Sequence, residues 1–230
     1  MSFKNRAEAG KRLAEALAKY RDTDPVILAL PRGGVAVAVE VAQAFGAPLD
    51  LILVRKIGVP TQPELAMGAV VDGGEPVIVR NEDVIAACGI SEEAFKRVCD
   101  AELCEIERRR KLYLKDRPRA ELKDRVVIVV DDGIATGATT RAALQAVRKR
   151  QPKVLVLAVP VAPASTLEEL QEEADDIVCL EAYEFFLAIG LYYQDFRQVT
   201  DKEVISLLLT APAPCSKSTT ALSERTHVAG

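Results

Sequence analysis

The sequence predicts an α/β fold with an open, mainly parallel sheet flanked by helices. Short aliphatic and β-branched runs alternate with stretches of helical length, and this alternation repeats along the chain. The runs are apolar at nearly every position, which is typical of strands buried on both faces of a parallel sheet. In such sheets ligands bind at the carboxyl ends of the strands.

The expected elements follow in chain order. Residues 1–20 alternate charges with Ala and Leu, which predicts an amphipathic helix. Buried strands are predicted at 26–30, 51–55, 126–130, 154–159 and 176–180. Helices are predicted between them at 35–45, 138–150 and 166–174. We expect one domain over residues 1–210 and a flexible tail over 211–230.

Two segments interrupt the alternation. Residues 67–80 predict a hairpin whose turn lies at 72–75, and residues 91–115 predict one long helix with an apolar stripe. The basic run 108–111 lies near the end of this helix, where positive charge suits the helix dipole. Because no aromatic residues are interleaved with it, we interpret the run as a solvated helix end and not as a nucleic-acid site.

Composition excludes several kinds of chemistry. The 230 residues carry a net charge of −4 and one histidine, His227, close to the C-terminus, which argues against Ser-His-Asp, Cys-His and histidine-zinc sites. Five cysteines without a CxxC pair predict free thiols in a reducing compartment. No apolar run is long enough to span a membrane and no leader pattern opens the chain, so we expect a cytoplasmic protein.

The stretch VVIVVDDGIATGATT, residues 126–140, carries the most chemical information. A buried strand ends in Asp131 and Asp132, and a glycine-containing turn then leads into a helix. The N–H groups and positive dipole of a helix N-terminus suit a phosphate group. Two carboxylates beside a phosphate make sense when the ligand also carries hydroxyl groups or a cation, as a phosphorylated sugar with Mg²⁺ does.

This pattern resembles the signature of the type I phosphoribosyltransferases. The resemblance implies their fold, with a small hood, and binding of phosphoribosyl pyrophosphate with Mg²⁺. It implies that Asp131 and Asp132 hold the ribose hydroxyls and contact the metal only indirectly. The 5′-phosphate would be bound by the loop after them, comprising Ala135, Thr136, Gly137, Ala138, Thr139 and Thr140.

Two further segments match the family in the expected order. LPRGG resembles its pyrophosphate loop, with Arg32, Gly33 and Gly34 as ligands and a cis peptide bond expected at Pro31–Arg32. Residues 54–70 are similar to its mobile catalytic loop, in which Arg55 and Lys56 would clamp the leaving group.

The acceptor is less well defined by the sequence. Ala135 stands where enzymes for 6-oxopurines carry an acid, whereas residues 183–199 loosely resemble the base-binding hood of those same enzymes. We therefore expect a nucleobase-like acceptor, with Phe185 or Phe186 stacking on it. The hood would comprise about 181–200, and a helical and hairpin insertion about 73–120 would complete it or form an interface, such as that of a homodimer.

The resemblance implies transfer of a phosphoribosyl group to a nitrogen nucleophile with release of pyrophosphate. A non-catalytic sensor of phosphoribosyl pyrophosphate or nucleotide on the same fold stays open as an alternative. So does a protein that binds or hydrolyses the sugar phosphate, with water in place of the base.

Overall fold

The computed structural model describes residues 2–72, 76–115 and 117–214. Its central sheet is parallel and has the strand order β2-β1-β6-β7-β8. These strands are β1 (Val26–Ala29), β2 (Leu49–Leu51), β6 (Val126–Val130), β7 (Val154–Pro163) and β8 (Asp176–Tyr183). The chain moves outward from β1 to β2 and then returns to the other side of β1 as β6. This reversal of strand order places a topological switch point between β1 and β6.

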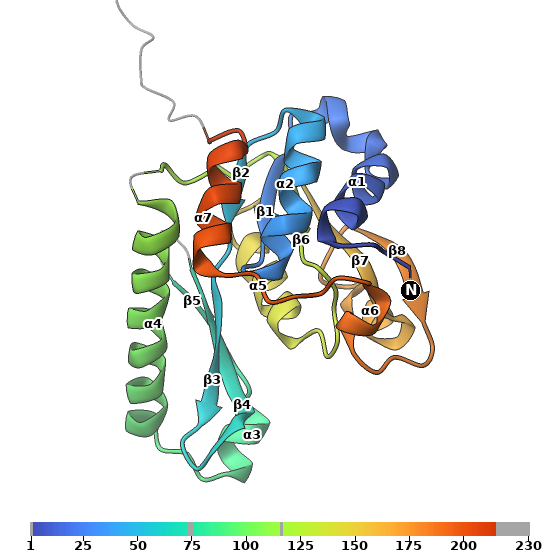
Figure 1. Cartoon of the computed structure of the whole chain (residues 1–230). Helices are drawn as coiled ribbons and strands as arrows, with labels where there is room; N and C mark the ends of the chain where they lie inside the picture. The colour runs from blue at the N-terminus through green and yellow to red at the C-terminus, as the bar shows by residue number, and fades with distance from the viewer. Residues whose placement is uncertain (1, 73–75, 116, 215–230) are drawn as a thin grey trace, which may run out of the picture.

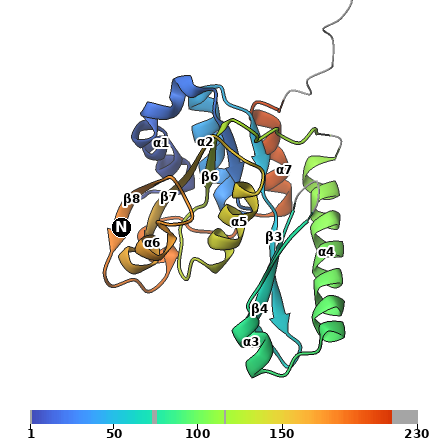
Figure 2. The ribbon, with the colours of Figure 1, turned by 180° about the vertical axis from the view of Figure 1, so that it is seen from behind.

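Helices cover both faces of this sheet (Figures 1 and 2). One layer contains α1 (Arg6–Ala16), α2 (Gly33–Phe45) and α7 (Asp201–Thr210), and the other contains α5 (Ala138–Arg148) and α6 (Ala164–Leu170). Strand alternation divides the core accordingly. Ile27 and Ile128 pack with α1, α2 and α7, while Leu28 and Val129 pack with α5 and α6.

A second, antiparallel sheet projects from the parallel one (Figure 1). It contains β3 (Val54–Val59), β4 (Gln62–Val71) and β5 (Val77–Arg80), followed by the short helix α3 (Glu82–Ala87). The long helix α4 (Glu92–Leu114) packs on one face of this sheet through Phe95, Cys99 and Ile106. The hairpin over 67–80 and the long helix are therefore confirmed.

The structure corrects two predictions in the region 51–70. The strand expected at 51–55 does not exist, because β2 ends at Leu51 and β3, in the other sheet, begins at Val54. The mobile loop expected at 54–70 is instead the strand pair β3–β4. Ile57, Val59 and Met67 are fully or almost fully buried, and Pro, Gly and Gln residues among them hid this strand pattern.

Smaller differences concern the ends of elements. Helix α6 ends at Leu170, before the predicted residue 174, and α5 ends at Arg148. The described residues also include two short 3₁₀ helices, at Ala18–Thr23 and Ile189–Tyr192. The turn residues 73–75, Cys215, His227 and the predicted tail from 215 onward lie outside the described residues. Within the described ranges, no helix has the length and apolar character that crossing a membrane requires.

Candidate functional site

Two loops meet at the carboxyl edge of the parallel sheet, one after β1 and one after β6. A Cβ atom on Gly33 would lie 1.9 Å from Oδ2 of Asp132, and one on Gly34 would lie 2.8 Å from the carbonyl oxygen of Val130. Only glycine allows the loops to approach this closely. The PRGG loop and the acid pair, predicted separately, therefore form one site, and the peptide bond Pro31–Arg32 is cis as expected.

Asp131 is the more accessible member of the acid pair. It is partly exposed, and its Oδ1 accepts a hydrogen bond from the backbone N–H of Asp132 at 2.8 Å. Burial of the carboxyl group, and then the neighbouring charge of Asp132, raise the pKa of Asp131 well above its usual range. Hydroxyl groups that donate to this carboxylate would stabilise its charged form.

Asp132 is only 8% exposed and is held by residues from both ends of the chain. Its Oδ2 lies 2.6 Å from Nε of Arg6, the first residue of α1. The hydroxyl of Tyr193 donates to its backbone carbonyl at 2.6 Å, and the ring of Phe196 lies 3.9 Å from the Arg6 guanidinium. Sequence reasoning missed Arg6 and Tyr193, because contacts across 126 and 61 residues leave no local pattern.

The expected phosphate loop leads directly into α5. Gly137 precedes the helix in the left-handed conformation, with φ of 72°, and no side chain caps the helix. The first N–H groups of the helix are therefore available to a ligand. Most of the predicted loop is exposed, namely Ala135, Thr136, Ala138 and Thr139, whereas Gly137 and Thr140 are buried.

Arg32 lies at the PRGG loop but is tied to α7. Its Nη1 is 3.5 Å from Oδ1 of Asp201, and Asp201 also accepts a hydrogen bond from the Tyr113 hydroxyl at 2.7 Å. Burial and this hydrogen bond raise the pKa of Tyr113 to about 12, while the bond from Tyr113 and the charge of Arg32 lower the pKa of Asp201. The long helix α4 is thus linked to the expected pyrophosphate loop.

Arg55 and Lys56 lie on β3, each with an acidic partner close by. Nε of Arg55 is 2.6 Å from Oε2 of Glu102 on α4, and Nζ of Lys56 is 3.1 Å from Oε2 of Glu64 on β4. Consecutive residues of a strand point to opposite faces, so the two cations diverge. Both nevertheless line one cavity of about 460 Å³ together with Thr139 of the phosphate loop.

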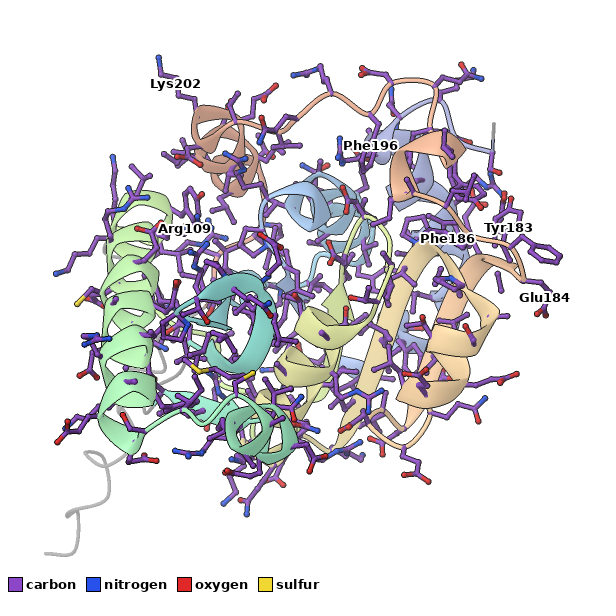
Figure 3. The ribbon with its side chains drawn as sticks, turned by 90° about the horizontal axis from the view of Figure 1, so that it is seen from below. Arg109, Tyr183, Glu184, Phe186, Phe196 and Lys202 are labelled. Atoms are coloured by element: carbon purple, nitrogen blue, oxygen red, sulfur yellow. The ribbon has the colours of Figure 1, made fainter. Side chains whose placement is uncertain are left out.

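The expected base-binding residues lie farther out. Phe185 is 94% exposed, and Phe186 stacks on Tyr192 with ring centroids 5.0 Å apart. Figure 3 shows Phe186 beside Tyr183, with Phe196 nearer to α7. Phe186 packs against the small apolar cluster that contains Phe3 and Tyr193.

Each residue of the basic run 108–111 has an acidic partner within the molecule. Arg108 and Arg109 pair with Glu105, Lys111 pairs with Glu107, and Arg110 pairs with the buried Asp72. The solvated helix end expected from the sequence is therefore wrong for Arg110, whose side chain is largely buried, whereas Arg108 and Lys111 are exposed as expected.

Comparison with known proteins identifies the family. The model of the phosphoribosyl transferase domain matches residues 2–195. The chain belongs to this family. A crystal structure of TT1426 from Thermus thermophilus is 44% identical, covers 91% of this chain and 98% of its own, and superposes with a TM-score of 0.78. This likeness confirms the mainly parallel sheet flanked by helices that the sequence predicted.

Two relatives come from Mycobacterium tuberculosis strains CDC 1551 and H37Rv. They are named "Putative phosphoribosyl transferase MT0597" and "Putative phosphoribosyl transferase Rv0571c". Each is 43% identical over 206 residues, which is 90% of this chain and 46% of the relative. The chain therefore spans about half the length of these relatives.

Proposed function

We propose that this phosphoribosyl transferase domain binds phosphoribosyl pyrophosphate with Mg²⁺ and transfers the phosphoribosyl group to a nitrogen nucleophile, a nucleobase-like molecule, with release of pyrophosphate. One observation carries the proposal. The PRGG loop, the acid pair and the uncapped N-terminus of α5 converge on one edge of the sheet, at its switch point.

Each part of this edge suits one part of the ligand. The N–H groups at the start of α5 and the hydroxyls of Thr136 and Thr139 suit the 5′-phosphate. The carboxylate of Asp131 suits hydroxyl donors of the ribose. Arg32 and the amides of Gly33 and Gly34 suit the pyrophosphate. Phosphate loop, acid pair and basic loop would thus bind the 5′-phosphate, the ribose and the pyrophosphate of phosphoribosyl pyrophosphate.

The reaction forms a bond from the acceptor nitrogen to the anomeric carbon and breaks the bond from that carbon to pyrophosphate oxygen. The bonding electron pair leaves with pyrophosphate, so positive charge develops on the sugar and negative charge on the leaving group. Fixed carboxylates beside the sugar and cations beside the leaving group favour this separation of charge. Arg32 of the PRGG loop would take the second task, and Lys56 would join it once Glu64 releases its ammonium group.

Within the described residues, no three His, Cys, Asp or Glu side chains form a metal-binding group. The donors that the site does offer are carboxylate oxygens, which suit Mg²⁺. Asp131 would hold the ion indirectly, through water or ribose hydroxyls, and the ion would neutralise pyrophosphate charge. The four described cysteines are free thiols, which supports a reducing, cytoplasmic setting. A homodimer stays a prediction.

The test is to incubate the protein with phosphoribosyl pyrophosphate and Mg²⁺, add nucleobases one at a time, and measure pyrophosphate release. We expect release that depends on one base or a small group of bases. Tight binding of phosphoribosyl pyrophosphate without release for any base would support the sensor instead. Release of ribose 5-phosphate without added base would indicate a hydrolase.

A further inference from the structure

The two adjacent acids occupy different environments. The Asp132 side chain is 12% exposed and the Arg6 side chain 11%, with their charged atoms 2.6 Å apart. Gly33 lies against the same carboxylate, since a Cβ there would come within 1.9 Å of Oδ2. The carboxylate of Asp132 is therefore enclosed between the PRGG loop and the start of α1, away from the open edge of the sheet.

Arg6 is itself fixed by several contacts. Besides Asp132, it donates through Nη1 to the carbonyl oxygen of Arg197 at 2.9 Å, and its guanidinium lies 3.9 Å from the ring centroid of Phe196. If Asp132 turned toward a sugar, this guanidinium would keep its charge in a largely buried position without a carboxylate. Such a state is strongly unfavourable, because breaking one half of a buried pair leaves an uncompensated charge.

Asp131 has no such partner. It is partly exposed, and no ion pair within the described part of the chain involves it. Its Oδ1 accepts the backbone N–H of the next residue. A carboxylate has two oxygens with about four acceptor positions, so one side chain suffices for the two hydroxyls of a cis-diol.

We infer that Arg6 is a positioning residue that holds Asp132 away from the sugar, so that Asp131 alone accepts the ribose hydroxyls. This inference rests on the proposed function of the site. In this view Asp131 binds the sugar and Asp132 does not, and Arg6, the first residue of α1, contributes to the sugar site by fixing Asp132. Because Arg6 also contacts residues 196 and 197, it joins the hood to the acid pair.

The experiment compares ribose 5-phosphate with 2-deoxyribose 5-phosphate by calorimetric titration, and a second series replaces the latter by 3-deoxyribose 5-phosphate, so that each hydroxyl is tested. A hydroxyl that donates to a carboxylate should give the wild-type protein a preference of about tenfold for ribose 5-phosphate. Asp131→Asn should reduce the preference to near one. Asp132→Asn should lower the affinities for both sugar phosphates by a similar factor and leave the preference for ribose 5-phosphate unchanged.

Arg6→Gln should lower the affinity of the protein for both sugar phosphates, measured well below the unfolding temperature of the variant. Arg6→Lys should restore part of that affinity. The matched control is Arg12→Gln, on the same helix, because Arg12 pairs with Glu181 and Glu8 and not with the acid pair. It should leave both affinities unchanged. Equal affinities for wild type and Arg6→Gln would show that Arg6 only stabilises the fold and would overturn its positioning role.

The decisive contrary result is loss of the preference in Asp132→Asn, because it would make Asp132 a ligand of the hydroxyls. Should that variant fail to fold, a crystal structure of the wild-type protein with ribose 5-phosphate decides. An intact Arg6–Asp132 pair with Asp131 on the hydroxyls supports the inference, whereas Asp132 on a hydroxyl overturns it. Wild-type protein that binds neither sugar phosphate nor phosphoribosyl pyrophosphate would instead overturn the proposed function itself.

Discussion

The carboxyl edge of the parallel sheet and the antiparallel sheet beside it present their functional residues differently. At the edge, Gly33 and Gly34 lie directly against the acid pair, so backbone geometry alone brings the two motifs together. In the antiparallel sheet, Arg55 and Lys56 each end on a nearby carboxylate. A motif at the end of a parallel strand thus has its position set by topology, whereas the direction of a charged side chain on a strand is set by its nearest partner.

The largest effect should come from breaking the ion pair at the edge. Arg6→Gln leaves the enclosed Asp132 carboxylate without its cation, which should lower the free energy of unfolding by about 3–5 kcal/mol. Urea denaturation measures the change. In the control Arg12→Gln, the lost side chain is 41% exposed, so the loss should stay below about 1 kcal/mol. Similar losses in both variants would contradict the view that Asp132 is buried with Arg6 as its partner.

The contact between the two loops gives the next largest effect. Gly33→Ala places a Cβ into the Asp132 carboxylate, so the loops must separate at a cost of about 1–3 kcal/mol. Binding of phosphoribosyl pyrophosphate, measured by thermal shift, should also weaken. Gly46→Ala is the control, because nothing lies within 4 Å and only its φ of +61° opposes a side chain. If Gly33→Ala kept full ligand binding, the close approach would not be needed for the site.

Asp131 should impose a pH dependence on stability. Its folded pKa is raised above the unfolded value near 3.9, so the native state binds the proton more tightly. Wild-type stability should therefore fall as pH rises from the unfolded value through the folded one. Asp131→Asn cannot titrate, so its stability relative to wild type should rise over that window in urea titrations from pH 4 to 8. Parallel curves for the two proteins would show that Asp131 is not perturbed.

The smallest effect concerns the antiparallel sheet. Glu64→Gln removes the charge that pairs with Lys56 but keeps the hydrogen bond from Lys56 to the backbone carbonyl of residue 64. The unpaired positive charge should tighten pyrophosphate binding by roughly two- to fivefold. The free energy of unfolding should change by less than about 1 kcal/mol. Glu107→Gln is the control, since it releases Lys111 on α4 in the same way. If the two variants bound pyrophosphate equally, Lys56 would have no part in the leaving-group site.

The sequence predicted those parts of the fold that depend on local pattern. The strand 126–130 and the start of α5 at Ala138 were located to the residue, because an all-apolar run ends at two acids and a glycine turn follows. The prediction for residues 51–70 is wrong, because Pro, Gly and Gln residues mask two strands whose burial depends on the distant helix α4. In the site, Gly33 and Asp132 were found by motif. Arg6 and Tyr193 were not, because only the tertiary fold brings them to Asp132.

The central claim is that Asp131, at the edge of the parallel sheet, holds the sugar of phosphoribosyl pyrophosphate. Calorimetric titration of wild type and Asp131→Asn with this ligand and Mg²⁺ tests it most directly, with circular dichroism to confirm that the variant is folded. We predict saturable binding by wild type and affinity lower by about tenfold or more in the variant. Equal affinities in the two folded proteins would contradict the claim.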